Sequence, residues 1–310
     1  MSKIPLIVIV GPTASGKTAL GVELARKLGT EVVSADSMQV YKRMNIGTAK
    51  PTEEEKKGVP HHMLDVVEPW ENFSVADYTA RAHECIAQIA ARGRIPIVVG
   101  GTGLYIRSLT QDIDFSKGQS DPHYRQQLQE QADREGNEPL YELLKRKDPP
   151  SAQRIHLNDT KRIIRALEVL HVTGTTMTEH QARAVSKPTR YESVKIGLSY
   201  DREKLYDRIN RRVDQMLEDG LEEEVLGLCR EKIENSTAMQ GIGYKEMVNY
   251  LKGESSLFEA AEAIKRGTRR YAKRQMTFFR ADSQIHWVDA TGRDAFELLD
   301  AISPYIKRAK

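Results

Sequence analysis

The sequence contains few cysteines and no long apolar run. Of its 310 residues only two are cysteines, Cys85 and Cys229. Two thiols cannot form a disulfide framework or a zinc site by themselves, so both are expected to be buried structural thiols in a reducing cytosol. The apolar stretch Leu6 to Val10 is far shorter than the ~20 residues of a membrane-spanning helix. It leads into a glycine-rich loop rather than a cleavage site, so we expect a cytoplasmic protein with no secretory signal and no membrane partner.

The sequence also lacks a large excess of charge of either sign. Its 47 Lys and Arg residues against 44 Asp and Glu residues give a net charge of +3, so the total charge does not require a polyanionic partner. Hydrophobic residues make up 39% and charged residues 29% of the chain. These shares are ordinary for globular domains and exclude a disordered chain, a collagen-like repeat and a bare coiled coil. The length favours about two domains of ~150 residues each.

Strand and helix patterns alternate over about the first hundred residues. The short apolar segments 4–10, 31–35 and 95–99 predict strands. Helices are expected at 17–28 and after Ser74, which opens a capping box. Alternating strands and helices with short connections are typical of a parallel sheet covered by helices.

The segment 111–188 carries no strand signal. Its helical patterns follow Asp121, Pro139 and Asp159, residue types that commonly begin helices. A mostly helical insertion is therefore predicted inside the α/β domain. The rest of the chain returns to the α/β pattern, with strands expected at 194–198 and 285–288 and long helices at 201–232 and 256–279. The predicted domains are a catalytic core with C-terminal helices, 1–110 and 189–310, and the insertion, 111–188.

Residues 11–18 match the phosphate-loop pattern G-x-x-x-x-G-K-S/T in full, between a predicted strand and a predicted helix. In such a loop several backbone N–H groups and the helix N-terminus converge on one anion. Lys17 supplies a mobile cation, and Thr18 supplies a hydroxyl ligand for Mg²⁺. The predicted phosphate-binding residues are Gly11, Pro12, Thr13, Ala14, Ser15, Gly16, Lys17 and Thr18. The predicted fold class is α/β, a P-loop NTPase-like parallel sheet flanked by helices, with a mostly helical insertion domain.

Two further residues are expected at the carboxyl edge of the sheet. Asp36 follows the second predicted strand, and ligands bind at that edge in open parallel sheets. It can contact a metal-bound water, act as a general base or simply cap a turn. Thr102 lies in a glycine-rich segment that lacks the spacing of a dinucleotide-binding motif, so a loop that approaches the ligand is the simpler interpretation.

The charged and histidine-containing segments are less specific. His61 and His62 with Asp65 resemble metal ligands, but a loop or packing role is favoured because adjacent histidines rarely point the same way. The predicted helix over 262–280 has seven basic residues and one acidic residue, with aromatic residues between them. Such a helix is typical of an RNA-binding surface, although a solvated face beside acidic helices is the alternative. Arg125, in the insertion, can contact either a phosphate or a neighbouring carboxylate.

Taken in order, these motifs resemble the tRNA dimethylallyltransferases, also called isopentenyl-tRNA transferases, of the bacterial type. The resemblance covers nearly the whole chain, and the ordered set is far more specific than the phosphate loop alone. It rests on the segments Gly11 to Thr18, Asp36 to Tyr41, Asn45 to Lys50, Pro60 to His62, Gly100 to Tyr105, Arg162 to Glu168, Ile242 to Glu246 and Ala272 to Gln275.

The resemblance implies transfer of a dimethylallyl group from its pyrophosphate to N6 of adenine 37, next to the tRNA anticodon. Pyrophosphate leaves, and N6-(dimethylallyl)adenosine forms. The implied catalytic residues are Asp36, Lys17, Thr18 and Thr102, with Mg²⁺ at Thr18. The implied tRNA-binding residues are Asp36, Ser37, Met38, Gln39, Thr102, Arg125, Lys161, Arg162, Ile163, Ile164, Arg165, Lys273, Arg274 and Gln275. The insertion would grip the anticodon stem-loop, and the enzyme is expected to be a monomer.

The sequence departs from the family pattern at three places. Gln240 stands where many bacterial relatives have arginine, so no cationic contact with pyrophosphate is expected there. Phe278 and Phe279 replace a pair that would contain tryptophan, and the zinc finger of eukaryotic relatives is absent.

Three alternatives remain open at this stage. A P-loop kinase would use Asp36 on an acceptor hydroxyl and would consume ATP without tRNA. A second prenyltransferase would modify free AMP, ADP or ATP. A phosphate-sensing RNA-binding module would retain tRNA without modifying it.

Overall fold

The computed structural model describes residues 3–113, 120–179, 189–234 and 236–307. It divides into two compact units, one formed by Met1–Thr110 with Arg190–Lys310 and the other by Gln111–Thr189. In the described parts of the chain, no helix combines the length and the apolar character needed to cross a membrane.

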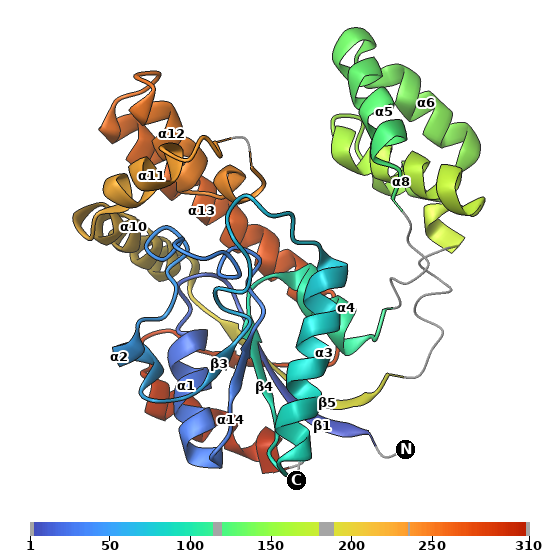
Figure 1. Cartoon of the computed structure of the whole chain (residues 1–310). Coiled ribbons are helices and arrows are strands. Elements are labelled where there is room, and N and C mark those ends of the chain that lie inside the picture. The colour runs from blue at the N-terminus through green and yellow to red at the C-terminus, as the bar shows by residue number, and fades with distance from the viewer. Residues whose placement is uncertain (1–2, 114–119, 180–188, 235, 308–310) are drawn as a thin grey trace. The chain divides into compact units, whose positions relative to one another are not determined.

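The first unit is built on a six-stranded sheet in the order β3-β2-β4-β1-β5-β6. Figure 1 labels β1, β3, β4 and β5 of this sheet. The strands are β1 (Ile4–Val10), β2 (Val32–Ser34), β3 (His61–His62), β4 (Ile97–Gly100), β5 (Tyr191–Ser199) and β6 (Ile285–Asp289). All neighbours run parallel, and in the centre Ile7 pairs with both Ile97 and Val194. This confirms the α/β fold class with a parallel sheet.

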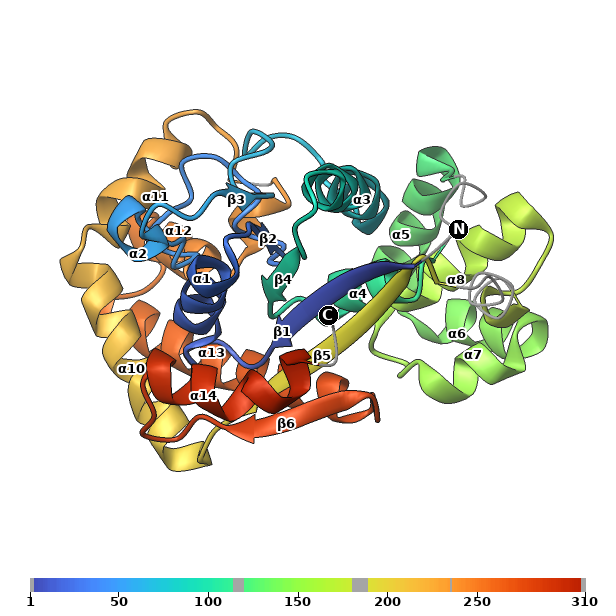
Figure 2. The ribbon, with the colours of Figure 1, turned by 90° about the horizontal axis from the view of Figure 1, so that it is seen from below.

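Helices cover both faces of the sheet (Figure 2). Ile7 and Ile9 of β1 face a core formed with α1 (Lys17–Leu28) and α14 (Ala295–Ile306). The alternate side chains of β1, among them Leu6 and Val8, face α3 (Val75–Ala91) and α4 (Gly103–Thr110). Burial on both faces explains why the first strand is an uninterrupted apolar run. Short α2 (Glu53–Lys56) lies between β2 and β3 in the chain.

A layer of helices from the C-terminal half packs on the segment that follows β2. Its members are α10 (Arg202–Glu218), α11 (Leu221–Cys229), the 3₁₀ helix η1 (Ala238–Gln240), α12 (Tyr244–Leu251) and α13 (Leu257–Arg280). Val40 and Met44 share one core with Val225 of α11 and Met247 of α12. The single helix expected over 201–232 is wrong, because Gly220 adopts a φ of 98° and separates α10 from α11. The turn lets Leu221 enter the same core.

The second unit is helical, as expected for this segment. Its labelled helices are α5 (Pro122–Glu135), α6 (Glu138–Lys147), α7 (Pro149–Arg154) and α8 (Thr160–Thr173). Leucine and isoleucine side chains from α5, α6 and α8 form its core. The side chain of Asp121 accepts a hydrogen bond from Tyr124 N and thereby caps α5.

Candidate active site

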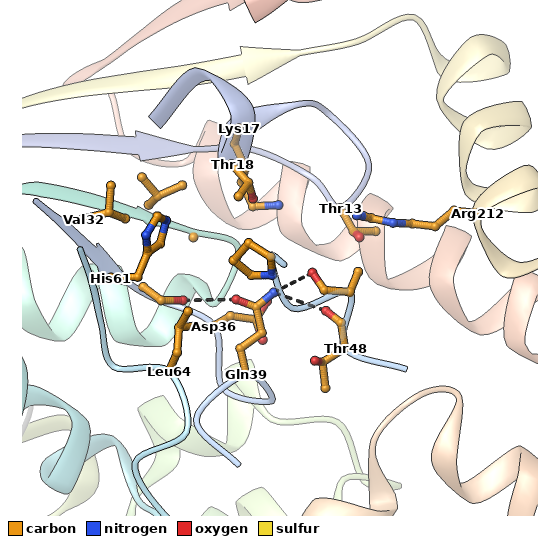
Figure 3. Close-up of a pocket in the computed structure, with 15 residues that line it drawn as sticks. Thr13, Lys17, Thr18, Val32, Asp36, Gln39, Thr48, His61, Leu64 and Arg212 are labelled. Carbon is orange, nitrogen blue, oxygen red and sulfur yellow. Dashed lines mark hydrogen bonds between the residues drawn. The ribbon is translucent and has the colours of Figure 1, made fainter. Parts of the chain in front are cut away.

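A polar pocket lies where the carboxyl ends of β2 and β4 meet the phosphate loop (Figure 3). Its volume is about 540 Å³, including space open to solvent. The lining residues are Thr13, Lys17, Thr18, Val32, Ser34, Asp36, Gln39, Thr48, Ala49, Pro51, His61, Leu64, Val99, Gly100 and Arg212. The structure therefore places Lys17, Thr18 and Asp36 around one space, as parallel strands that end at one edge require.

The phosphate loop connects β1 to α1, which begins at Lys17. The Lys17 ammonium donates to the Pro12 carbonyl at 3.2 Å and so folds back over the loop. Removal from water lowers the pKa of Lys17 to about 8, although the negative charge of Asp36 opposes this shift. Within the described structure, the buried hydroxyl of Ser15 has no hydrogen-bond partner. An unpaired hydroxyl and a cation thus belong to the loop that holds the anion in such motifs.

Three arginines of α10 extend this cationic surface, and the sequence analysis did not identify them. Arg208, Arg211 and Arg212 line an adjoining pocket together with Lys17 and Thr18. Nε of Arg208 donates to the Ala14 carbonyl at 2.9 Å. The spacing i, i+3 and i+4 places such side chains on one helix face. This spacing can be recognised in the sequence, but it does not show that this face of α10 is directed toward the phosphate loop.

The segment after β2 forms the opposite wall. One Asp36 carboxylate oxygen, Oδ1, accepts from Met38 N at 2.9 Å, so Asp36 both caps a turn and lines the pocket. The Thr102 hydroxyl accepts from Ser37 N at 2.9 Å and donates to the Ser37 hydroxyl at 3.3 Å. Tyr271 of α13 belongs to the same neighbourhood, since burial and the charge of Asp36 raise the pKa of Tyr271 to about 12, against the effect of a hydrogen bond with Thr102.

Gln275 connects the two walls. Its side chain is only 4% exposed, and its Oε1 accepts from Thr13 N at 2.9 Å. Its Nε2 donates to the Gly101 carbonyl, also at 2.9 Å. Both polar atoms of the amide bond to backbone groups, so this side chain bridges two loops. The direct tRNA contact that the resemblance implies for Gln275 stays a prediction.

The basic helix α13 is divided between packing and exposure. Lys265 forms ion pairs with Asp214 and Glu262, and Arg269 donates to Asn210. In this part of the helix the cations are therefore paired with side chains of α10 and of α13 itself. By contrast, Lys273 and Arg274 are exposed, and the guanidinium of Arg274 lies 5.8 Å from the centre of the Tyr271 ring.

In the second unit the predicted tRNA-binding residues fall into two groups. Lys161 and Arg162 are exposed at the start of α8, whereas Ile163 and Ile164 are 0% and 3% exposed in the helical core. The same helix turn supplies the core, so these two isoleucine side chains are not available to RNA; the contacts implied for this segment stay a prediction. Arg125 and Arg165 both bind the fully buried carboxylate of Glu168. For Arg125 the structure thus shows the carboxylate contact.

The remaining candidates contact other parts of the chain, and of them His61 also lines the pocket. His61 bonds to the Val59 carbonyl and His62 to Glu31, as β3 pairs with β2. Among the described residues, no group of three or more His, Cys, Asp or Glu side chains is placed to hold a metal ion. Gln240 lies in η1, where its Nε2 donates to the Glu234 carbonyl at 3.4 Å. Phe278 packs on Gly103 while Phe279 is buried.

The chain is similar to proteins of one known family. The model of the IPP transferase family matches residues 39–282. A tRNA dimethylallyltransferase of Bacillus licheniformis is 50% identical over 290 residues, which cover 94% of this chain and 92% of that protein. The corresponding protein of Bacillus subtilis is 47% identical over 290 residues, which are 94% of this chain and 92% of that protein.

Solved structures agree with these matches. The full-length tRNA isopentenylpyrophosphate transferase of Bacillus halodurans has a TM-score of 0.74 and 44% identity, with 99% of this chain and 98% of that chain covered. A eukaryotic dimethylallyltransferase that was crystallised acting on tRNA has a TM-score of 0.79 and 31% identity, with 98% of this chain and 77% of that chain covered.

Proposed function

This chain belongs to the IPP transferase family, and we propose that it transfers a dimethylallyl group from dimethylallyl pyrophosphate to N6 of adenine 37 in tRNA. The observation that carries the proposal is the juxtaposition of Lys17, Thr18 and Asp36 around one pocket. A phosphate-binding loop alone would serve a kinase equally well. Together with the family, the carboxylate beside the loop supports transfer of an organic group to an amine.

The donor occupies the phosphate-loop side in this proposal. The C–O bond between the allylic carbon and pyrophosphate breaks, and the negative charge that develops on the leaving group is stabilised by Lys17 and the loop N–H groups. Arg208 and Arg212 line the adjoining pocket, so their positive charges add to this stabilisation.

The acceptor occupies the opposite wall. As the new C–N bond forms, a proton must leave the exocyclic amine of adenine, and the Asp36 carboxylate is the group that lines the pocket and can accept it. The base must leave the anticodon stack to reach this pocket. Thr102 holds Ser37 and thereby fixes the turn that carries Asp36; its role in the proposal is to position the acceptor side.

Mg²⁺ is the proposed cofactor. Thr18 and Asp36 line the same pocket and offer the oxygen ligands that Mg²⁺ prefers. Since the described residues hold no cluster of three acidic or imidazole ligands, the ion would be held mainly by phosphate oxygens and water, which is usual for Mg²⁺ on phosphates. When bound, it supplies positive charge against the departing pyrophosphate.

The tRNA contacts proposed for the chain are those that remain accessible. Lys161 and Arg162 in the insertion, with Lys273 and Arg274 on α13, are exposed cations suited to a phosphate backbone. A cytoplasmic location and a monomeric state complete the proposal, since the acceptor is cytoplasmic tRNA and the pocket is formed within one chain.

Mass spectrometry of nucleosides from tRNA incubated with the chain, Mg²⁺ and dimethylallyl pyrophosphate tests this function. We expect adenosine that carries one added dimethylallyl group, located at position 37 by nuclease mapping. Parallel incubations use AMP, ADP or ATP as acceptor, or ATP without a prenyl donor. Modification of free nucleotides alone, or ATP consumption without tRNA, would contradict the proposal.

A further inference from the structure

The carboxylate of Glu224, in the first turn of α11, accepts hydrogen bonds from four donors on two other segments. Its Oε2 accepts from Asn45 N and Ile46 N at 2.8 Å each. Its Oε1 accepts from Gly47 N at 3.1 Å and from the Tyr244 hydroxyl at 2.6 Å. Three successive backbone N–H groups that converge on one anion form a nest, and hydrogen bonds to a charged acceptor are the strong ones.

The segment 45–50, here the Gln39-support loop, is held on its other sides as well. The Tyr244 ring packs so closely on Gly47 that a Cβ atom there would lie 2.6 Å from the ring. Burial and the charge of Glu224 raise the pKa of Tyr244, so its hydroxyl stays a donor. The buried Lys50 ammonium donates to Asn45 Oδ1 at 2.9 Å and to Asp65 at 2.6 Å. The loop is therefore fixed by groups outside the pocket.

This loop orients Gln39. The amide nitrogen of Gln39 donates to the Thr48 carbonyl at 3.2 Å and to the Ala49 carbonyl at 3.1 Å. Its oxygen accepts from the Ser34 hydroxyl at 3.3 Å (Figure 3). Gln39, Thr48 and Ser34 all line the pocket that contains Asp36. The Thr48 and Ala49 carbonyls hold the Gln39 nitrogen and so fix the orientation of the amide, which leaves the Gln39 oxygen as the acceptor in the pocket.

We propose that Glu224 is a positioning residue for the acceptor base. It holds the Gln39-support loop so that the Thr48 and Ala49 carbonyls keep the Gln39 oxygen in the pocket, where it accepts a hydrogen bond from the adenine amine beside Asp36. Glu224 itself is not among the residues that line this pocket. The inference rests on the proposed function and adds a residue that acts through Gln39.

The test is steady-state prenyl transfer by Glu224→Ala, with unmodified tRNA and dimethylallyl pyrophosphate varied separately. We expect kcat/KM for tRNA to fall on the order of tenfold, since small displacements of a substrate-orienting group are costly. The KM for the donor should stay within about twofold of wild type. Glu224→Gln, which keeps one acceptor oxygen, should be intermediate. Glu223→Ala is the matched control, because Glu223 is exposed in the same helix turn, and it should behave like wild type.

A double-mutant cycle separates positioning from general damage. If Glu224 acts through Gln39, then Glu224→Ala in a Gln39→Ala background should lower kcat/KM for tRNA by no more than about twofold further. A full repeat of the tenfold loss in that background, an equal rise in the donor KM, or wild-type kinetics of Glu224→Ala would overturn the inference.

A second variant guards against a failure to fold. Tyr244→Phe keeps the ring on Gly47 and removes one of the four donors, so it should lower kcat/KM for tRNA by about threefold. That effect should vanish in the Gln39→Ala background, and an effect that persists there would also overturn the inference. Failure of the proposed function is recognised separately, because wild type would then form no dimethylallyl-tRNA at all.

Discussion

Gln275→Met is the substitution that most directly tests how the two walls of the pocket are joined. Methionine has nearly the same length and shape as glutamine but cannot hydrogen bond to either loop. The Gly101 carbonyl, which is buried, would lose its partner, and an unpaired buried group costs about 1 to 3 kcal/mol. Thr13 N is half-buried and would recover part of its bond from water. We therefore expect a loss of about 1 to 4 kcal/mol in the free energy of unfolding.

Urea unfolding followed by fluorescence and circular dichroism measures this loss, and equilibrium binding of dimethylallyl pyrophosphate shows whether the phosphate loop is disturbed with it. Gln215→Met serves as the control, since Gln215 is exposed on α10 and its side chain, among the described residues, bonds only to Asp219. Its effect should stay within about 0.5 kcal/mol. If Gln275→Met weakened tRNA binding while the unfolding free energy matched that of wild type, the bridge would be refuted and a direct RNA contact supported.

The remaining predictions concern the two substrates. Asp36→Asn should lower kcat by ~100-fold or more with donor affinity nearly unchanged, as single-turnover kinetics and equilibrium dialysis would show; wild-type turnover would exclude the general base. Because the pKa of Lys17 is about 8, its charge is lost as pH rises through 8, so donor affinity should fall between pH 7 and 9. Lys17→Met should bind the donor more weakly and show no such slope; an equal slope in both proteins would contradict this reasoning. Arg162→Ala should weaken tRNA binding and reduce the slope of log K against log salt by about 0.7 to 0.9. Arg134→Ala, which changes another exposed arginine of the same unit, should do neither. If the salt plot of Arg162→Ala ran parallel to that of wild type, Arg162 would not contact the tRNA backbone.

The features that the sequence predicted correctly are those that depend on neighbours in the chain. The run Ile4 to Val10 forms β1, and the following helix ends at Leu28 before Gly29, as expected. The box of Ser74 with Asp77 caps α3, and its two reciprocal hydrogen bonds involve residues three apart. Periodicity and caps act over one or two turns, so one sequence is enough to recognise them.

Features that depend on distant partners were missed. Strand β3 has only two residues, and it forms because they pair with Val32 and Val33 of β2. A pattern of neighbouring residues therefore does not predict it. The pairing of Arg125 with Glu168 joins residues 43 positions apart, so the sequence did not show whether Arg125 contacts a phosphate or a carboxylate. The exposed face of α13 and its paired face both carry basic residues, and the ion pair of Lys265 with Asp214 depends on the approach of α10, which the sequence of α13 does not show.

The motifs consist of neighbouring residues, whereas the side chains that hold the motifs in place are distant in the sequence. The motifs therefore indicated the chemistry of the site but not the residues that fix its geometry. Lys17, Thr18 and Asp36 lie in short segments directly after strands, so the topology of a parallel sheet brings them to one edge. Their relative placement depends on Gln275, which lies 262 positions from Thr13, and on Glu224, which lies 177 positions from Gly47. Each of these side chains satisfies backbone groups of a loop rather than lining the pocket. A rigid arrangement of donor and acceptor walls is what a reaction between two bound substrates requires, so substitutions at these bracing residues should disturb catalysis although the motif residues remain intact.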